Sequence, residues 1–264
     1  MFIEHLSHSR ANLFEECELK YNYKYHERIK MGEPEPIYFL YGKVVHKFAE
    51  EYTLHKGQRP APAILQDILT GTIPLERKEG GDYGKPDLPM EYIGRLKNEV
   101  TNVTKICDKL GYEGYVEWPF DYDLDPPNKK RIIGFIDRLI PLHGGKKFVI
   151  LDYKTTKTGP WRKDQNSIKK DMQLKTYARI VQKHFNVSGE NIAACLHYVT
   201  DNKVVGVQSF SDRDLEYTEK VLLDTYNQIN DTPPEAARPN VGRHCVRCEF
   251  VKICRAYRNS QMNG

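Results

Sequence analysis

The sequence lacks any run of about 18 consecutive apolar residues, the length that a membrane-spanning helix needs. It also lacks the N-terminal order of basic, apolar and small residues that marks a secretory signal. Internal repeats, low-complexity tracts and long linkers are absent as well. We therefore expect a cytoplasmic protein with no membrane partner.

A strong excess of one charge is missing too. Forty Lys and Arg against 36 Asp and Glu give a formal net charge of +4 and a pI of about 8.6. This mild basicity is compatible with a nucleic-acid partner but does not by itself indicate one. The 17 tyrosines are stronger evidence for a nucleic-acid partner, since the segment KYNYKYHERIK at 20–30 alternates tyrosines with basic residues. Such a segment could stack bases beside phosphate contacts, or it could be a helix whose tyrosines pack against the core.

The distribution of apolar residues predicts alternating helices and strands. Helices are expected at 9–30, 37–56, 88–110, 168–185 and 212–230, and strands at 114–123, 131–140, 147–155, 192–199 and 203–210. We expect irregular structure at 57–90, where Gly and Pro are frequent, and a loop at 158–167. This order predicts an α/β fold in which helices flank a central mixed sheet.

The segment GFIDRLIPLHGGKKFVILDYKT places charged residues inside two apolar runs. With Gly144–Gly145 as a two-residue hairpin turn, Asp137 lies directly across from Asp152, and Phe135 across from Lys154. Opposed carboxylates repel, and a Mg²⁺ or Mn²⁺ ion, which prefers oxygen ligands, would cancel the repulsion. A solvated strand face is the alternative that a lone Asp-x-Lys would favour.

Three other polar residues are ambiguous when taken singly. Gln173 and Tyr177 are four residues apart and so share one face of the predicted helix, where they could orient a phosphate, a water or a lysine. Such a pair is more often ordinary helix surface. His46, beside valines, is either a boundary residue or a metal ligand.

Together, these positions resemble the RecB-type branch of the PD-(D/E)xK nuclease superfamily. The matching motifs are Gly42-x3-His46, Gly134-x2-Asp137, Asp152-x-Lys154-Thr155 and Gln173-x3-Tyr177. The resemblance runs through most of the chain. Ile136 replaces the proline of the superfamily name, at a position that varies.

The resemblance implies the fold and the domain organisation. It implies a restriction-endonuclease-like core, with a central mixed sheet flanked by helices, in a single nuclease domain over 1–264. Within that domain, 1–30 and 240–264 would together form a metal-cluster module, and 37–230 a helical cap and the nuclease core.

The resemblance also assigns roles to residues. The implied ligands of Mg²⁺ or Mn²⁺ are His46, Asp137, Asp152 and the backbone carbonyl of Tyr153. Lys154 would position and help to deprotonate the attacking water or stabilise charge on the scissile phosphate, and Gln173 and Tyr177 would orient Lys154 and the DNA backbone. Glu117, in VEWPF, is either an acid that supports the ligands or a charge at a strand edge.

A second group of candidate ligands contains cysteine. Cys17 and the triple Cys245-x2-Cys248-x5-Cys254 offer four thiolates, which can hold zinc or an iron–sulfur cluster. A resemblance to the AddB nuclease domain and to the small CRISPR-associated exonucleases implies a [4Fe-4S] cluster. The rival is zinc held by His244, Cys245, Cys248 and Cys254. The remaining cysteines, Cys107 and Cys195, are expected to be small buried residues.

The resemblance thus implies a metal-dependent DNA exonuclease that acts on single-stranded or free ends. It would serve recombination, repair, phage DNA processing or CRISPR adaptation. One alternative is a DNA-end binding module of a larger helicase–nuclease complex, and another is a zinc-stabilised RNA-processing nuclease. Since the sequence contains no helicase motif, any unwinding would come from a helicase or recombination partner.

Overall fold

The structure is a computed structural model that describes residues 3–32, 36–75, 85–159 and 162–262. The chain divides into two compact units. Unit 1 comprises Met1–Pro34, Phe120–Gly134 and Tyr217–Gly264, and unit 2 comprises Glu35–Pro119 and Phe135–Glu216. Both cysteine-bearing segments belong to unit 1, and the single domain stays a prediction. Four stretches that fall within predicted regions lie outside the described residues: 1–2, 76–84, 160–161 and 263–264.

Helices form at most of the predicted places. They are α1 (His8–Glu16), α2 (Glu18–Tyr21), α3 (Ile37–Leu54), α4 (Ala61–Thr70), α5 (Met90–Leu110), α6 (Met172–Phe185), α7 (Asp212–Asp231) and α8 (Arg255–Met262). No helix of the described residues combines the length and the hydropathy that a membrane span requires.

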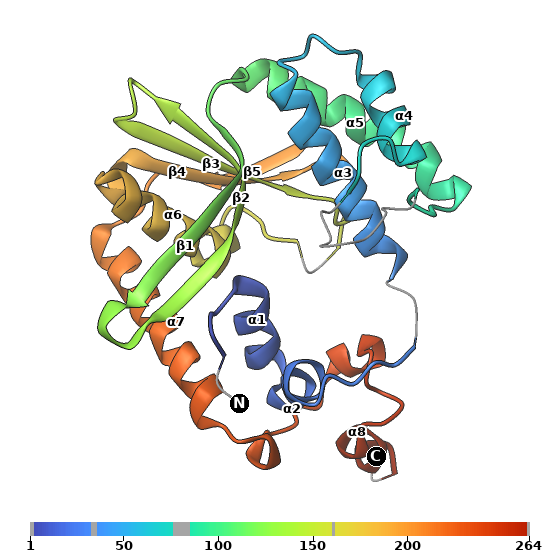
Figure 1. The fold of residues 1–264 in the computed structure, drawn as a ribbon, viewed down its shortest axis with the longest axis vertical. Coiled ribbons are helices and arrows are strands. Elements are labelled where there is room, and N and C mark those ends of the chain that lie inside the picture. Colours follow the sequence, from blue (N-terminus) through green and yellow to red (C-terminus); the bar gives the residue numbers. More distant parts are fainter. Residues whose placement is uncertain (1–2, 33–35, 76–84, 160–161, 263–264) are drawn as a thin grey trace. The chain divides into compact units, whose positions relative to one another are not determined.

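The strands form one mixed sheet. They are β1 (Tyr115–Asp125), β2 (Lys130–Leu142), β3 (Lys147–Lys154), β4 (Ile192–Tyr198) and β5 (Lys203–Val207), in the spatial order β1-β2-β3-β4-β5 (Figure 1). The pairs β2–β3 and β4–β5 are antiparallel, whereas β3 and β4 are parallel, with α6 in the connection between them. The predicted mixed α/β sheet is confirmed.

The register of β2 on β3 is the one predicted from the glycine pair. Arg138 lies opposite Leu151, and Leu142 opposite Lys147. The two-residue turn is wrong, however, because pairing stops at Leu142 and Lys147 and leaves a four-residue loop. His143, like Gly144 and Gly145, has a positive φ (50°). The chain therefore leaves the strand conformation already at His143, one residue before the glycine pair.

In unit 2, helices cover both faces of β3. Leu151 and Tyr153, which share one face of the strand, are buried in a core made with α3, α4 and α5. Asp152 and Lys154 point to the opposite face, where Lys154 contacts α6. Figure 1 shows α3, α4 and α5 grouped together, with α6 near β3 and β4. The site residues of β3 therefore alternate with core residues.

One motif glycine has a packing reason. A Cβ atom at Gly134 would lie 2.6 Å from the Phe120 ring, closer than real contacts allow. The glycine thus makes room for an aromatic side chain of the neighbouring strand β1.

Two predictions about helices are wrong. The predicted helix over 9–30 is interrupted at Cys17, whose extended backbone (φ −167°, ψ 112°) separates α1 from α2, and a π-helix follows at Asn22–His26. The region expected to be irregular contains α4, which begins after Pro60 and ends at Gly71 in the left-handed conformation. Two of its apolar residues, Ile64 and Ile68, are fully buried.

Candidate active site

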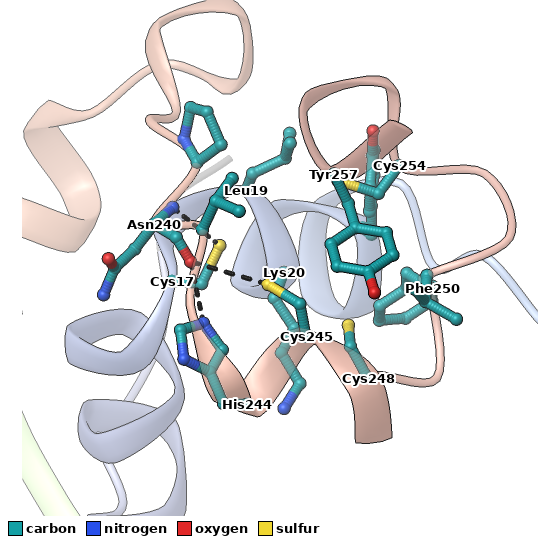
Figure 2. Close-up of a pocket in the computed structure, with 14 residues that line it drawn as sticks. Cys17, Leu19, Lys20, Asn240, His244, Cys245, Cys248, Phe250, Cys254 and Tyr257 are labelled. Carbon is teal, nitrogen blue, oxygen red and sulfur yellow. Dashed lines mark hydrogen bonds between the residues drawn. The ribbon is translucent and has the colours of Figure 1, made fainter. Parts of the chain in front are cut away.

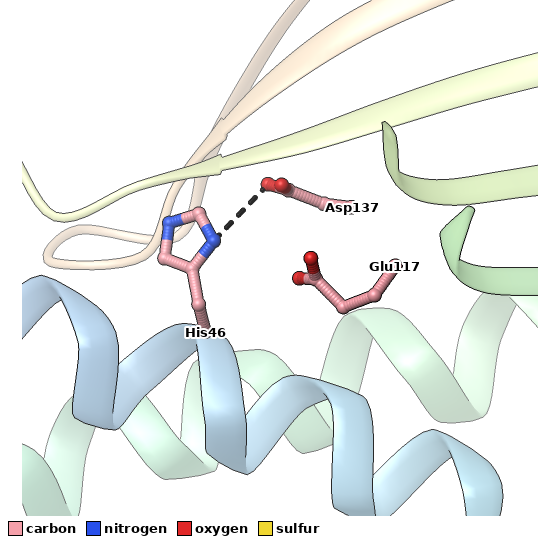
Figure 3. Close-up of side chains that lie close together, drawn as sticks. All are labelled: His46, Glu117 and Asp137. Carbon is pink, nitrogen blue, oxygen red and sulfur yellow. Dashed lines mark ion pairs between the residues drawn. The ribbon is translucent and has the colours of Figure 1, made fainter. Parts of the chain in front are cut away.

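Three elements of unit 2 bring candidate metal ligands together. His46 comes from α3, Glu117 from β1 and Asp137 from β2, and their ligand atoms all lie within 4.8 Å of one another. His46 Nδ1 is 3.3 Å from Asp137 Oδ2. Figure 3 shows the imidazole and both carboxylates pointing toward one another. An imidazole with two carboxylates suits a divalent cation such as Mg²⁺ or Mn²⁺.

Glu117 reaches this group through an unusual backbone conformation. Its φ of 45° is in the left-handed region, although the residue is part of a strand. Burial, and then the nearby charge of Asp137, raise the pKa of Glu117 to about 7. Of the two alternatives for Glu117, the structure therefore favours an acid beside the ligands over a strand-edge charge.

Asp137 also closes the end of the β2–β3 ladder. The regular pairing stops at Arg138 and Leu151, and beyond it Asp137 Oδ2 accepts the Tyr153 N–H at 2.7 Å. Burial opposes the charge of Asp137, but the His46 charge and hydrogen bond prevail and lower its pKa. Burial likewise opposes the charge of His46, yet Asp137 raises its pKa to about 9.

A chain of polar contacts runs beside this group. Lys154 Nζ lies 2.7 Å from Asp152 Oδ2 and donates to Gln173 Oε1 at 3.0 Å. Gln173 Nε2 in turn contacts Tyr177 OH at 2.7 Å. The side chain of Asp152 is 2% exposed and that of Lys154 31% exposed. The Asp152 carboxylate is thus held inside the protein, while the Lys154 side chain is partly exposed.

Burial makes the charged form of Asp152 unfavourable. Burial is the main cause that raises its pKa, to about 6, and the charge of Asp137 adds to it, while Lys154 acts in the opposite direction. Apart from the ion pair with Lys154, its Oδ2 has no hydrogen-bond partner. A buried carboxylate oxygen with so little compensation fits a site that takes up a cation.

The structure places the residues predicted for the site in two adjoining sets. His46 and Asp137 gather with Glu117, whereas Asp152 lies outside that group of three and is joined to Lys154, Gln173 and Tyr177. Tyr153 presents its backbone to Asp137, and its ring is buried. Both sets belong to unit 2.

The cysteines predicted to bind a cluster line a common pocket in unit 1. Cys17, Cys245, Cys248 and Cys254 surround it together with aromatic side chains that include Phe250 (Figure 2). Among the described residues, which include all of these cysteines, no three of the sulfur atoms lie within 4.8 Å of one another. The sulfurs face a shared space without forming a compact group.

Backbone amides point at two of these sulfurs. The Asn240 N–H donates to Cys17 Sγ and the Gly242 N–H to Cys245 Sγ, both at 3.4 Å. Burial outweighs an opposing backbone hydrogen bond and raises the pKa of Cys248. His244 Nε2 donates to the Asn240 carbonyl oxygen at 2.7 Å, because a carbonyl oxygen can only accept.

The other cysteines have a different environment. Cys107 is fully buried, as predicted, and lies 3.5 Å from the hydroxyl groups of Thr53 and Tyr153. Cys195 is half-buried and donates to the Ile150 carbonyl. Neither faces the pocket in unit 1.

Comparisons with known proteins agree with this architecture. No curated protein matches the sequence. A crystal structure of a candidate exonuclease from Eubacterium rectale matches with a TM-score of 0.55 and 14% identity, over 97% of this chain and 88% of that chain. The crystal structure of SSO0001 gives a TM-score of 0.38 at 14% identity, over 91% of this chain and 95% of that chain, which is too low to support an argument. The family model of the PD-(D/E)XK nuclease superfamily matches residues 5–255, so the chain belongs to this superfamily and has its mixed α/β nuclease fold.

Proposed function

We propose that this nuclease is a divalent-metal-dependent deoxyribonuclease that degrades single strands from their ends. The observation that carries the proposal is the convergence of His46, Glu117 and Asp137 beside the pair Asp152–Lys154. Hydrolysis of a phosphodiester needs an activated water and positive charge near the phosphate, and a site of this composition can provide both.

The proposed metal ligands are His46, Asp137, Asp152 and the Tyr153 carbonyl, with Glu117 as a further acid. A bound Mg²⁺ or Mn²⁺ ion would supply charge to the phosphate and make water more acidic. The protein's own contribution is to hold these donors in place before the ion arrives. Asp137 does so through its contacts with His46 and with the backbone of β3.

Lys154 is the proposed group that acts on the substrate directly. Contacts with Asp152 and Gln173 fix its ammonium, and its side chain is partly exposed. From this position it can donate to a phosphate oxygen or orient the attacking water. Tyr177, through Gln173, is a positioning residue for Lys154.

We also propose that Cys17, Cys245, Cys248 and Cys254 hold a [4Fe-4S] cluster. The four cysteines line one common pocket, which supports a shared inorganic centre. The choice of a [4Fe-4S] cluster over zinc rests on the resemblance to the AddB nuclease domain and to the small CRISPR-associated exonucleases. The cluster would join the two ends of the chain and serve stability more than chemistry.

A cleavage assay on end-labelled DNA tests the proposed activity. Linear single strands should be degraded with Mg²⁺ or Mn²⁺ but not with Ca²⁺, whose looser coordination activates water poorly. A circular single strand of the same sequence should resist, and equally fast loss of the circle would show an endonuclease. Binding of DNA ends without cleavage would favour the binding-module alternative, and cleavage restricted to RNA would favour the RNA-processing one.

The proposed biological setting is DNA recombination, repair, phage DNA processing or CRISPR adaptation. The Eubacterium rectale neighbour, a candidate exonuclease, supports degradation from ends. A helicase or recombination partner would deliver the single strand, and co-purification with such a partner would test this.

A further inference from the structure

Two exposed phenylalanines lie on the elements that carry the active-site residues. Phe39, on α3, is 54% exposed, and Phe135, on β2, is 57% exposed. Among the residues that the structure describes, no other phenylalanine is exposed. Exposed apolar side chains are common singly, but here both lie on elements that bring a ligand to the same site.

Phe135 lies next to Asp137 on the same face of β2. Alternation along a strand places residues two apart on one side, and the buried Ile136 confirms that the side chain between them points the other way. Two residues of a strand span about 6.6 Å. The Phe135 ring is thus an immediate neighbour of the metal-binding carboxylate.

Phe39 has the equivalent relation to His46 on α3. The two residues are seven positions apart, so they share one face of the helix at a separation of about 10 Å along its axis. The ring of Tyr38, which is also exposed, lies 4.6 Å from that of Phe39 and widens the aromatic surface. His46 and Asp137 are in contact, so each phenylalanine shares an element face with one member of the same pair of candidate ligands.

We propose that Phe135 and Phe39 stack on unpaired bases of a single-stranded DNA substrate, Phe135 nearer to the scissile phosphate and Phe39 farther from it. This rests on the proposed function. Each base has a flat π surface that an aromatic ring can contact whatever the sequence. In a duplex these surfaces are stacked on one another, so the rings select for single strands.

Binding of a short labelled single strand, in EDTA so that nothing is cleaved, tests the proposal. Phe135→Ala and Phe39→Ala should each weaken binding at least about 5-fold, the lower end of what stacking one base contributes. Phe135→Trp should restore affinity and Phe135→Leu should not, which separates stacking from apolar contact. Tyr217→Ala removes an aromatic ring that is 66% exposed on α7 and serves as the matched control.

Strands with one abasic site locate each ring. A strand of the shortest length that binds tightly cannot slide, so an abasic site should weaken wild-type binding at the position that meets Phe135. In Phe135→Ala, an abasic site at that position should no longer weaken binding. An abasic site at the position that meets Phe39 should still weaken it. Wild-type affinity in both phenylalanine variants, or losses that are the same at every abasic position, would overturn the proposal.

Cleavage of the intact strand with Mn²⁺ is measured in parallel. A wild-type protein that cleaves, together with phenylalanine variants that bind normally, contradicts the stacking proposal alone. A wild-type protein that binds in the expected pattern but does not cleave contradicts the proposed function alone.

Discussion

The carboxylate site of unit 2 and the cysteine pocket of unit 1 are held in different ways. In unit 2, regular elements position each side chain, and the polar groups bind one another, as Asp137 does with His46 and Lys154 with Gln173. In unit 1, turns and short helical segments carry the cysteines, and backbone amides are the partners of two sulfurs. The first site is held by contacts among its own side chains, whereas the second is held by the backbone turns that surround the pocket.

This difference predicts which property a substitution changes at each site, the cleavage rate or the stability of the fold. Removing one group from the carboxylate site should change chemistry and leave folding intact, because the neighbouring strands and helices remain packed. Removing one cysteine should weaken the fold of unit 1, because a bound cluster would contribute free energy that the surrounding turns do not supply. Four substitutions test this, in decreasing order of their expected effect on cleavage.

Asp137→Asn should have the largest effect. The amide keeps an oxygen for the Tyr153 N–H but loses the charge that a divalent cation requires. Cleavage should fall by about 10³-fold or more, since several kcal/mol of transition-state stabilisation is lost, while the melting temperature changes little. Asp121→Asn, which alters an exposed ion pair with Arg131, is the control. Retained cleavage in Asp137→Asn would refute the assigned site.

Glu117→Gln should have the next largest effect. If Glu117 supports the metal, the rate should fall by about 10- to 100-fold, and half-maximal activity should require more Mn²⁺. Metal titrations of the cleavage rate measure both. Glu113→Gln, at a side chain that is 85% exposed, should leave both unchanged. If Glu117→Gln needs no more Mn²⁺ than the wild type, Glu117 does not support the metal and is a charge at a strand edge.

Gln173→Ala should have a smaller effect, about 10-fold on kcat. It removes one of the two contacts that fix the Lys154 ammonium, so the rate should fall while KM for the strand stays nearly constant. Gln165→Ala, whose amide binds the Gly206 backbone, is the control. A change confined to KM would show that Gln173 binds the strand and does not position Lys154.

Cys248→Ser should change cleavage least, within about 3-fold below the unfolding temperature. Protein purified without oxygen should be yellow-brown, and this variant should lose the colour, because iron–thiolate charge transfer disappears. Its melting temperature should fall by about 5 °C or more, since each kcal/mol moves a chain of this size by about 2–4 °C. Cys195→Ser should alter neither property. Colourless wild-type protein with one bound zinc ion would contradict the cluster and support the zinc site instead.

Much of the fold could be predicted because hydrophobic patterns reflect burial directly. The strands around Asp137 and Asp152 are alternating or continuous apolar runs, and Gly144–Gly145 set the register that the structure has. The helix α4 was missed, although Pro60 and Gly71 mark its ends. Frequent Gly and Pro in the surrounding region concealed this pattern.

The site was harder to predict where it depends on tertiary contacts. Nothing local indicates that Glu117 adopts a left-handed conformation inside a strand, so the sequence left its approach to His46 and Asp137 as one of two alternatives. Similarly, no Gly or Pro marks the break at Cys17, which places its sulfur beside the Asn240 amide. Both are local conformations imposed by neighbours distant in the sequence.

The left-handed backbone at Glu117 has a consequence for laboratory evolution. A side chain in this conformation costs about 1–2 kcal/mol, which glycine would avoid. A screen that rewards heat resistance alone would therefore favour Glu117→Gly. If Glu117 supports the metal, as proposed, the same substitution would lower the cleavage rate, so selection for thermal stability and selection for activity would act in opposite directions at this position.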